Sequence, residues 1–212
     1  MTSIVILISG RGSNMQSIVE SAKNEAWPAK ISAVISNSPN PVPLEFAREN
    51  GIPAAFLDHK NFSSRLDFDR ELMAMIDAHS PDLVVLAGFM RILTPEFVNR
   101  YKNRLLNIHP SLLPLFPGLK THEQALKAGV KEHGATVHFV TEALDHGPIV
   151  IQAKVPVFPE DSPETLAERV LKQEHIIYPR AIRWFIDNRI LIDQNRVQIR
   201  PAESQLVVSQ DK

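Results

Sequence analysis

The sequence contains no cysteine in its 212 residues, so neither a disulfide framework nor a thiolate metal site can form. It also lacks any block of lysine or arginine, and its formal net charge is -1. Nucleic acids and anionic membrane surfaces are bound through concentrated positive charge, so neither is an expected partner. No run of about 18 apolar residues suggests a membrane-spanning helix. We therefore expect a cytoplasmic protein.

Several catalytic signatures are missing as well. The eight histidines form no HxH or HxxxH pair, so no metal site is predicted. There is no GxSxG nucleophile motif, and without cysteine there is no thiol nucleophile. Three of the histidines, His59, His79 and His133, are expected on the surface.

What the chain does contain is an alternation of short apolar runs and amphipathic stretches. Continuous β-branched runs are typical of parallel strands buried on both faces, and helical spacing of apolar residues separates them. Strands are predicted at 4–9, 31–36, 83–88, 135–140 and 148–158. Helices are predicted at 14–24, 63–79 and 162–188. This pattern predicts an α/β fold: an open, mostly parallel, twisted sheet with helices on both faces and a Rossmann-like N-terminal half.

Proline marks the interruptions and the start of the last helix. The stretches 37–43 and 109–118 each hold three prolines and are expected to be irregular. Ser162 followed by Pro163 predicts a helix start, and Pro179 is expected to kink or break that helix. We expect one domain over residues 1–200, with halves at about 1–100 and about 101–200. Residues 201–212 are mostly polar and are expected to form a flexible tail.

The segment SGRGSN (9–14) lies between the first predicted strand and the first predicted helix. Two glycines allow a tight turn, and a helix N-terminus offers free N–H groups to an anion. Neither a P-loop nor a complete dinucleotide motif is present. The segment therefore predicts a monophosphate site at Gly12, Ser13 and Asn14, with a plain glycine turn and serine cap as the alternative.

Two further segments contain polar residues suited to carbonyl chemistry. Asn107 and His109 are two positions apart, so on an extended strand end they point the same way. An amide donor beside an imidazole can stabilise an oxyanion. The alternative is a histidine that bonds only to the backbone. Asp145 lies on a turn-rich stretch, where a carboxylate is usually just solvated, unless the fold brings it to His109.

Taken together and in order, six segments carry a resemblance to a known family. They are SGRGSN, LAGFMRIL (86–93), LLNIHPSLLP (105–114), HGATVHFV (133–140), LDHGPI (144–149) and QEHIIYP (173–179). The series resembles the glycinamide ribonucleotide transformylase family of folate-dependent formyltransferases, over nearly the whole chain to about residue 190. The Asn-x-His-Pro-Ser-Leu-Leu-Pro segment is similar across the wider superfamily.

The resemblance implies a role for each matching residue. Asn107, His109 and Asp145 would be catalytic. Gly12, Ser13 and Asn14 would bind the substrate phosphate, and Glu174 would hold glycinamide ribonucleotide. The implied contacts for 10-formyltetrahydrofolate are Arg65, Met90, Arg91, Ile92, Leu93, Asn107, Thr141, Glu142, Ala143, Leu144 and Asp145. A cis peptide at Leu113–Pro114 is also implied.

The resemblance further implies the activity: transfer of the formyl group of 10-formyltetrahydrofolate to the amine of glycinamide ribonucleotide in purine biosynthesis. Asn107 and protonated His109 would stabilise the oxyanion, and Asp145 would assist proton transfer. No metal is expected. The partners are these two small molecules, with the protein a monomer or homodimer.

Three rival functions share parts of this pattern. Formyltetrahydrofolate hydrolase would have a domain before the first strand, and methionyl-tRNA formyltransferase would have a basic C-terminal domain; the length and charge of this chain favour neither. A non-catalytic nucleotide-binding module would not need the three polar residues to converge. A separation of more than about 8 Å between His109 and Asp145 would favour that module.

Overall fold

The computed structural model describes residues 1–209, which divide into two compact units. The first covers residues 1–107, and the second begins at Ile108. The predicted single domain with halves near residue 100 stays a prediction, and each unit is described by itself below.

The first unit is an α/β unit whose strands all run parallel. In spatial order, its strands are β5 (Leu105–His109), β4 (Leu83–Leu86), β1 (Thr2–Ile8), β2 (Ala29–Ser36) and β3 (Ala54–Phe56). Its helices are α1 (Ser13–Asn24), α2 (Val42–Glu49), α3 (Arg65–Asp77) and α4 (Pro95–Arg100), with a 3-10 turn at His59–Asn61. The predicted mostly parallel α/β fold with a Rossmann-like first half is confirmed.

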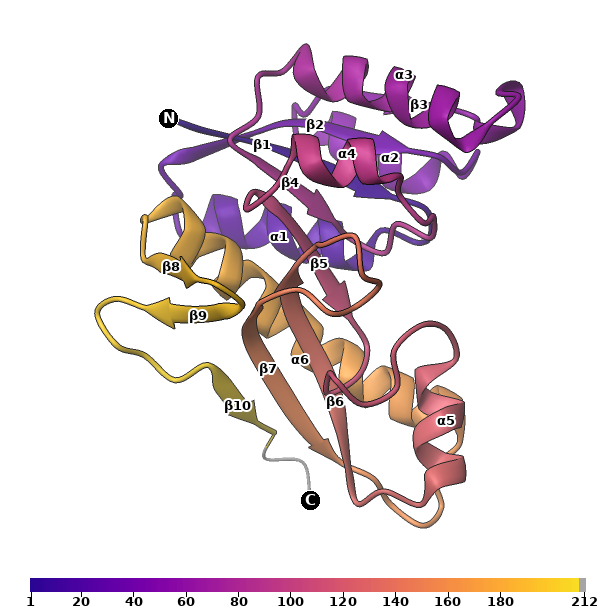
Figure 1. Cartoon of the computed structure of the whole chain (residues 1–212), viewed down its shortest axis with the longest axis vertical. Coiled ribbons are helices and arrows are strands. Elements are labelled where there is room, and N and C mark those ends of the chain that lie inside the picture. The colour runs from indigo at the N-terminus through magenta and orange to yellow at the C-terminus, as the bar shows by residue number, and fades with distance from the viewer. Residues whose placement is uncertain (210–212) are drawn as a thin grey trace. The chain divides into compact units, whose positions relative to one another are not determined.

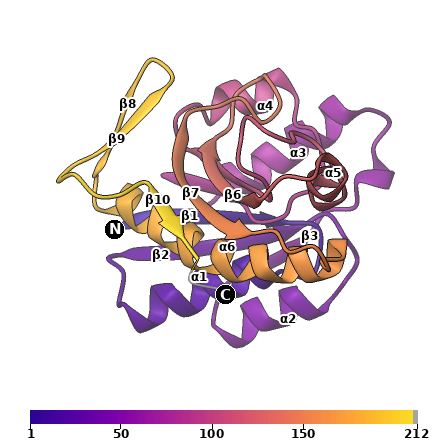
Figure 2. The same ribbon diagram turned by 90° about the horizontal axis from the view of Figure 1, so that it is seen from below.

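The order of strands reverses at β1, because β2 and β3 lie on one side of it and β4 and β5 on the other. Figures 1 and 2 show the consequence: α1 and α2 cover one face of this sheet, and α3 and α4 cover the other. Open sheets of this kind bind ligands beyond the carboxyl ends of the strands that flank such a reversal. The loops after β1 and β4 are therefore the expected ligand-binding loops of this unit.

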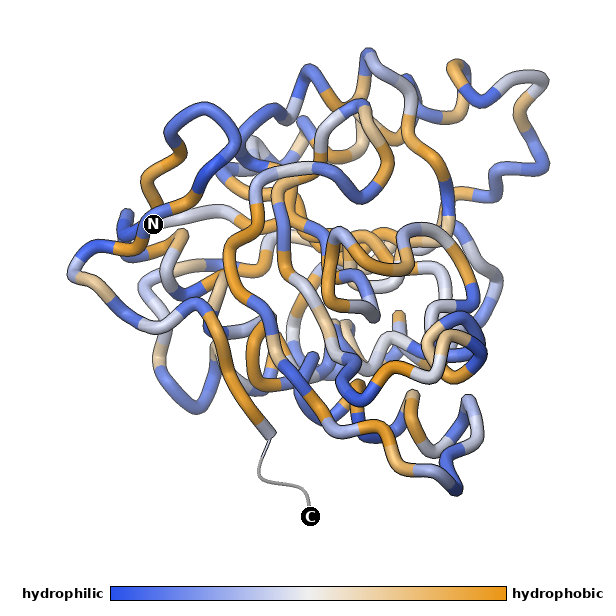
Figure 3. Tube along the Cα trace, turned by 60° about the horizontal axis from the view of Figure 1, so that its bottom comes forward, coloured by the Kyte–Doolittle hydropathy of each residue, from blue (hydrophilic) through white to orange (hydrophobic). Residues whose placement is uncertain are grey.

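The core of the first unit is the continuous apolar run in β1. Ile4 to Ile8 are all fully buried, as are Leu83 to Val85 in the neighbouring strand. Figure 3 shows hydrophobic colour along many inner stretches of the trace and hydrophilic colour on many outer turns. Burial on both faces explains why these runs lack the polar alternation of a half-exposed strand.

The second unit combines an antiparallel pair with a long helix. Strands β6 (Glu132–Phe139) and β7 (Ile149–Pro156) pair antiparallel, and β10 (Leu206–Val208) adds to β7 in parallel. Strands β8 (Ile190–Asp193) and β9 (Arg196–Ile199) form a separate hairpin. The helices are α5 (Thr121–Ala128) and α6 (Pro163–Ile186), and α6 packs on β6 and β7.

Helix α6 begins as the sequence predicts. The Ser162 side chain accepts the N–H of Thr165, and the Thr165 hydroxyl accepts the N–H of Ser162. Pro163 occupies the first helical position. Pro179 does not break the helix, which continues to Ile186. Burial of Tyr178, Pro179 and Ile182 keeps this part of the helix packed, which offsets the lost backbone bond.

Two irregular regions differ from the prediction. Residues 42 and 43, predicted as part of a turn, begin α2, because proline is tolerated in the first helical turn. The predicted flexible tail contains strand β10, where three apolar residues pair with β7 and the Gln205 side chain donates to the Val150 carbonyl. The rest of that predicted tail, residues 210–212, lies outside the described residues.

Within residues 1–209, no helix has both the length and the apolar character needed to cross a membrane.

Candidate active site

The candidate site is built around the end of β5. Asn107 and His109 are two residues apart on this strand, which gives their side chains the same direction. Asn107 is half-buried, whereas His109 is only 5% exposed. The end of β5 thus contains a half-buried amide and an almost buried imidazole.

Both ring nitrogens of His109 face acceptors. Nε2 lies 2.9 Å from the Phe116 carbonyl oxygen, and Nδ1 lies 3.6 Å from Oδ2 of Asp145. A neutral imidazole has one N–H and therefore serves one of these acceptors, whereas the imidazolium has a donor for each. Each ring nitrogen of His109 thus has an acceptor oxygen opposite it.

Asp145 is held in place by backbone geometry. It lies in the loop between β6 and β7 with φ 54, a left-handed conformation that aspartate tolerates. Its Oδ2 accepts the Gly118 N–H at 2.9 Å, and its side chain is 7% exposed. The carboxylate is thus fixed by the 110–118 loop as well as by its own loop. It is not the solvated surface carboxylate that a turn-rich stretch usually contains.

Gly147 closes the base of the Asp145 loop. A Cβ at this position would lie 1.7 Å from the Phe139 carbonyl oxygen, which no side chain can accommodate without movement of the backbone. The Phe139 N–H also donates to the Pro148 carbonyl at 2.9 Å. Only glycine permits this close approach, so Gly147 fixes where the loop leaves the two strands.

A second histidine flanks Asp145. Nε2 of His138 lies 3.8 Å from Oδ1 of Asp145, and its Nδ1 lies 3.0 Å from the Phe139 carbonyl oxygen. Burial lowers the pKa of His138, although the Phe139 carbonyl and the Asp145 carboxylate act in the opposite direction. Asp145 therefore lies between two imidazoles, one on each carboxylate oxygen.

Two neighbouring histidines, His122 and His133, lie next to Phe116. Nε2 of His133 is 3.2 Å from Nδ1 of His122, and the His133 ring meets the Phe116 ring edge to face. Burial, and then His122 and His109, lower the pKa of His133 to about 4. The expectation that His133 is a surface residue is wrong: it is fully buried, because it packs against these rings. His59 and His79 are only partly exposed.

The loop between β5 and α5 is anchored by polar contacts to β6 and β7. Thr136 donates to the Ser111 carbonyl at 2.6 Å and accepts the Leu113 N–H at 3.1 Å. The Gln152 side chain donates to the Leu113 carbonyl at 3.0 Å. The Leu113–Pro114 peptide is cis, as the resemblance implies. These contacts fix the loop whose Phe116 carbonyl and Gly118 N–H meet the His109 and Asp145 pair.

The glycine loop of the first unit leads into α1. Gly12 has φ 75, and a Cβ there would lie 2.7 Å from Cβ of Pro43, so a larger residue would be strained and crowded. Ser13 is the first residue of α1, and no side chain caps this helix N-terminus. Asn14 is 8% exposed. Backbone N–H groups and a positive dipole end are thus present where the sequence predicts a phosphate site, and the binding roles stay predictions.

Segment 90–93 follows β4 in the same unit. The Met90 and Ile92 side chains are 69% and 59% exposed, unusual values for large apolar residues that otherwise fill this core. Arg91 stacks over the Phe68 ring at 5.0 Å, and Leu93 is half-buried. Arg65, also a predicted folate contact, is exposed at the first position of α3.

The remaining predicted binding residues lie in the second unit. Thr141, Glu142, Ala143 and Leu144 precede Asp145 in its loop, and Leu144 is 56% exposed. Glu174 is on α6 and only 7% exposed, so it is not a solvated helix charge.

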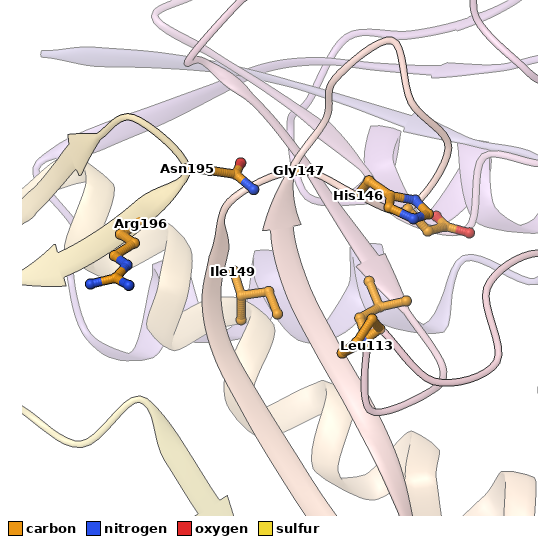
Figure 4. A pocket seen from close by; sticks show the side chains of 8 residues that line it. Leu113, His146, Gly147, Ile149, Asn195 and Arg196 are labelled. Atoms are coloured by element: carbon orange, nitrogen blue, oxygen red, sulfur yellow. The ribbon is translucent and has the colours of Figure 1, made fainter.

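A cavity of about 370 Å³ lies beside Asp145 in the second unit. Figure 4 shows Leu113 and His146 on one side of it and Asn195 and Arg196 on the other; Asn195 lies in the turn between β8 and β9, and Arg196 is the first residue of β9. The hairpin residues were not predicted to approach the site, because nothing in their local sequence indicates it. Among residues 1–209, no cluster of three or more histidine or acidic side chains is arranged to hold a metal ion.

The His109–Asp145 distance of 3.6 Å is shorter than the roughly 8 Å beyond which a binding module would be favoured. The sequence profile of the formyl transferase family matches residues 2–182, which is most of the chain. The chain belongs to the formyl transferase family. Its two central site residues, and the loops that hold them, all lie within the matched region.

Individual relatives give a finer comparison. The chain is 54% identical to phosphoribosylglycinamide formyltransferase of Escherichia coli (strain K12), over 91% of each protein. Glycinamide ribonucleotide transformylase 1 from Symbiobacterium toebii has a similar structure, with a TM-score of 0.91, 46% identity and 94% of each chain covered. A formyltetrahydrofolate deformylase from Pseudomonas syringae pv. tomato str. DC3000 is also similar, with a TM-score of 0.87, 30% identity, and 93% of this chain but 65% of that chain covered.

Several residues of the site were missed by sequence reasoning. Phe116 and Gly118 contribute backbone atoms, and backbone atoms leave no signature in residue type. His138 did stand in a recognised segment, HGATVHFV, but its position opposite Asp145 depends on the pairing of β6 with β7.

Proposed function

We propose that this chain transfers the formyl group of 10-formyltetrahydrofolate to the amine of glycinamide ribonucleotide, as a phosphoribosylglycinamide formyltransferase of de novo purine biosynthesis. The observation that carries the proposal is the His109 environment, with one ring nitrogen on the Asp145 carboxylate and the other on a carbonyl. It occurs in a chain that is 54% identical, over 192 aligned residues, to a protein of that name. A cytoplasmic monomer or homodimer is part of the proposal.

The folate donor fits the exposed apolar side chains of the first unit. Met90 and Ile92 offer large apolar surfaces at the expected ligand-binding edge of the sheet. A flat aromatic ligand would cover such surfaces. When bound, the folate supplies the formyl group on its N10 nitrogen; the remaining steps depend on residues of this chain.

Glycinamide ribonucleotide has a phosphate at one end and an amine at the other. The phosphate suits the uncapped N-terminus of α1, with Gly12, Ser13 and Asn14 as its contacts. Glu174 would hold the glycinamide end. Its burial distinguishes it from the solvated charges on the exposed face of α6.

The chemical step is a direct exchange of one C–N bond for another. The bond between the amine nitrogen and the formyl carbon forms, the bond from that carbon to N10 breaks, and a proton moves from the amine to N10. Asn107 and the His109 imidazolium donate hydrogen bonds to the formyl oxygen as it gains negative charge. Asp145 holds the imidazolium and passes on the amine proton, through water.

The structure adds one condition to this step. Nε2 of His109 is bonded to the Phe116 carbonyl, and Nδ1 faces Asp145. A formyl oxygen must therefore share a ring N–H with one of these acceptors or displace the Phe116 carbonyl. By the second route, binding of the donor would shift the 110–118 loop.

The experiment that tests the function offers three acceptors to the purified protein with 10-formyltetrahydrofolate. Glycinamide ribonucleotide should be formylated far faster than water or methionyl-tRNA. Release of formate as the main product would instead favour a deformylase, the function in the name of the Pseudomonas syringae relative. Transfer to methionyl-tRNA would favour a methionyl-tRNA formyltransferase.

A further inference from the structure

A single hydroxyl group joins the loops that follow β1, β2 and β4. Ser9 is the residue after β1, and its Oγ donates to Oδ1 of Asn37, the residue after β2, at 2.6 Å. The same Oγ accepts the backbone N–H of Met90, beyond β4, at 2.8 Å. The Ser9 N–H also donates to the Gly88 carbonyl at 3.2 Å. One small side chain therefore connects three segments that are far apart in sequence.

The position of Ser9 is the point where the strand order reverses. The chain passes from β1 to β2 and β3 on one side, and β4 lies on the other side of β1. Ligands of open α/β sheets bind at such a reversal. Ser9 therefore belongs to the glycine loop on the β1 side and fixes the start of segment 90–93 on the β4 side.

Asn37 determines the direction of the hydroxyl proton. Its Oδ1 accepts hydrogen bonds and cannot donate, so the Ser9 proton points toward Asn37 and a lone pair remains for the Met90 N–H. Asn37 is 7% exposed, and its own N–H donates to the Ile8 carbonyl at 3.2 Å. The arrangement is thus fixed on both sides of the hydroxyl.

Segment 90–93 is held by Ser9 at Met90, and its other end is fixed as well. The Thr94 N–H donates to Oδ2 of Asp69, a fully buried carboxylate on α3, at 2.7 Å. Between the two fixed ends, Met90 and Ile92 remain largely exposed. A backbone held at both ends that exposes apolar side chains has the properties of a preorganised binding surface, because little ordering remains when a ligand binds.

We propose that Ser9, oriented by Asn37, is a positioning residue for the folate donor: it holds the Met90 backbone so that segment 90–93 is ready to bind. Ser9 makes no contact with the reacting atoms in this proposal. The proposal rests on the proposed function, in which segment 90–93 contacts the folate.

The first test is Ser9→Ala. This change leaves the Met90 N–H and the Asn37 Oδ1 without their partner. Loss of the net contribution of one hydrogen bond, here a partly exposed one, typically changes an affinity by about 2- to 12-fold. We expect the KM for 10-formyltetrahydrofolate and the Kd for tetrahydrofolate, measured by calorimetry, to rise by that factor. The KM for glycinamide ribonucleotide should change by less than about 3-fold and kcat by even less, since uniform donor binding is what is lost.

Ser36→Ala is the matched control. Ser36 ends the neighbouring strand β2 and is more deeply buried than Ser9, and among residues 1–209 its hydroxyl bonds to the backbone of Ser38 in its own loop. Removing it should leave tetrahydrofolate binding unchanged. Ser9→Thr, which keeps a hydroxyl, should recover most of the donor affinity. Adding Asn37→Ala to Ser9→Ala should weaken donor binding little further, because the two side chains act through one contact.

The outcomes separate this proposal from the function on which it rests. Unchanged tetrahydrofolate binding in Ser9→Ala, with wild-type formyl transfer intact, overturns the positioning role alone. An equal rise in both KM values, together with a lower melting temperature, also overturns it and assigns Ser9 to general stability. A wild-type protein that neither binds tetrahydrofolate nor transfers the formyl group overturns both proposals.

Discussion

Replacement of Asp145 by asparagine isolates the charge of the carboxylate from its shape. In the native protein Oδ2 lies 3.6 Å from Nδ1 of His109, and the Asp145 side chain is 7% exposed. At an effective dielectric constant of about 20, two unit charges at that distance attract by about 5 kcal/mol. Desolvation of the buried carboxylate offsets part of this value. The remaining loss, about 3 to 4 kcal/mol, corresponds to a fall in kcat of about 100- to 1000-fold.

The assay combines kinetics with NMR of the histidine rings. Asp145→Asn, His109→Ala and the double variant are compared for kcat with both substrates saturating. The double variant should be little worse than the worse single one, because the two residues act as a unit. Imidazole ¹⁵N shifts at one fixed pH report whether both nitrogens of His109 carry protons. The imidazolium signal should be weaker in Asp145→Asn.

Two results would refute this reasoning. If the ring of His109 has the same protonation with and without the carboxylate, Asp145 does not hold its charge. If the kcat losses of the single variants multiply in the double variant, the residues act independently. Either outcome removes the pair from the mechanism. His79→Gln, remote from β5 in sequence and only partly exposed, controls for the effect of changing a histidine.

Three further predictions follow from the glycine loop, Glu174 and the buried histidine pair. Ser13→Pro should raise the KM for glycinamide ribonucleotide and leave the folate KM nearly unchanged. Proline is tolerated at the first helical position, but it removes an N–H from the phosphate site. An equal rise of both KM values would contradict this prediction. Glu174→Ala should raise the acceptor KM more than the folate KM with kcat nearly unchanged, and an unaltered acceptor KM would remove its assignment. The pKa of His133 is about 4 in the folded protein, below its ordinary value of about 6.5, so the unfolded chain takes up the proton more readily. The contribution of neutral, buried His133 to the free energy of unfolding is therefore complete above about pH 6.5. It is lost as the pH falls to about 4, and the total loss is at most about 3 kcal/mol. Urea unfolding of the wild type and His133→Gln across this pH range measures the loss. If the free energy of unfolding depends on pH in the same way in both proteins, His133 is not its source.

Much of the fold was predictable because its signals are local. The buried strand β1 is apolar at every position from Ile4 to Ile8, and no other element gives that pattern over such a short length. The start of α6 at Ser162 and Pro163 follows from capping chemistry in adjacent residues. Strand β10 was missed because its three apolar residues lie in a polar stretch and become a strand only by pairing with β7.

The site was predictable only in part, for the same reason. The residue types at 107 and 109 indicated carbonyl chemistry, but the approach of Asp145 depends on the loop between two antiparallel strands. Backbone groups of Phe116 and Gly118 complete the pair, and no residue type encodes them. His133 was misplaced because its residue type does not indicate burial, whereas in the fold its ring packs against His122 and Phe116.

The most direct test of the proposed function is the fate of the formyl group in a single reaction mixture. Purified protein is incubated with 10-formyltetrahydrofolate carrying a labelled formyl carbon, together with glycinamide ribonucleotide, and the products are separated. The account predicts that the label appears in formylglycinamide ribonucleotide in equal amount to the tetrahydrofolate formed, with little labelled formate. Labelled formate as the main product, or no dependence on glycinamide ribonucleotide, would contradict it.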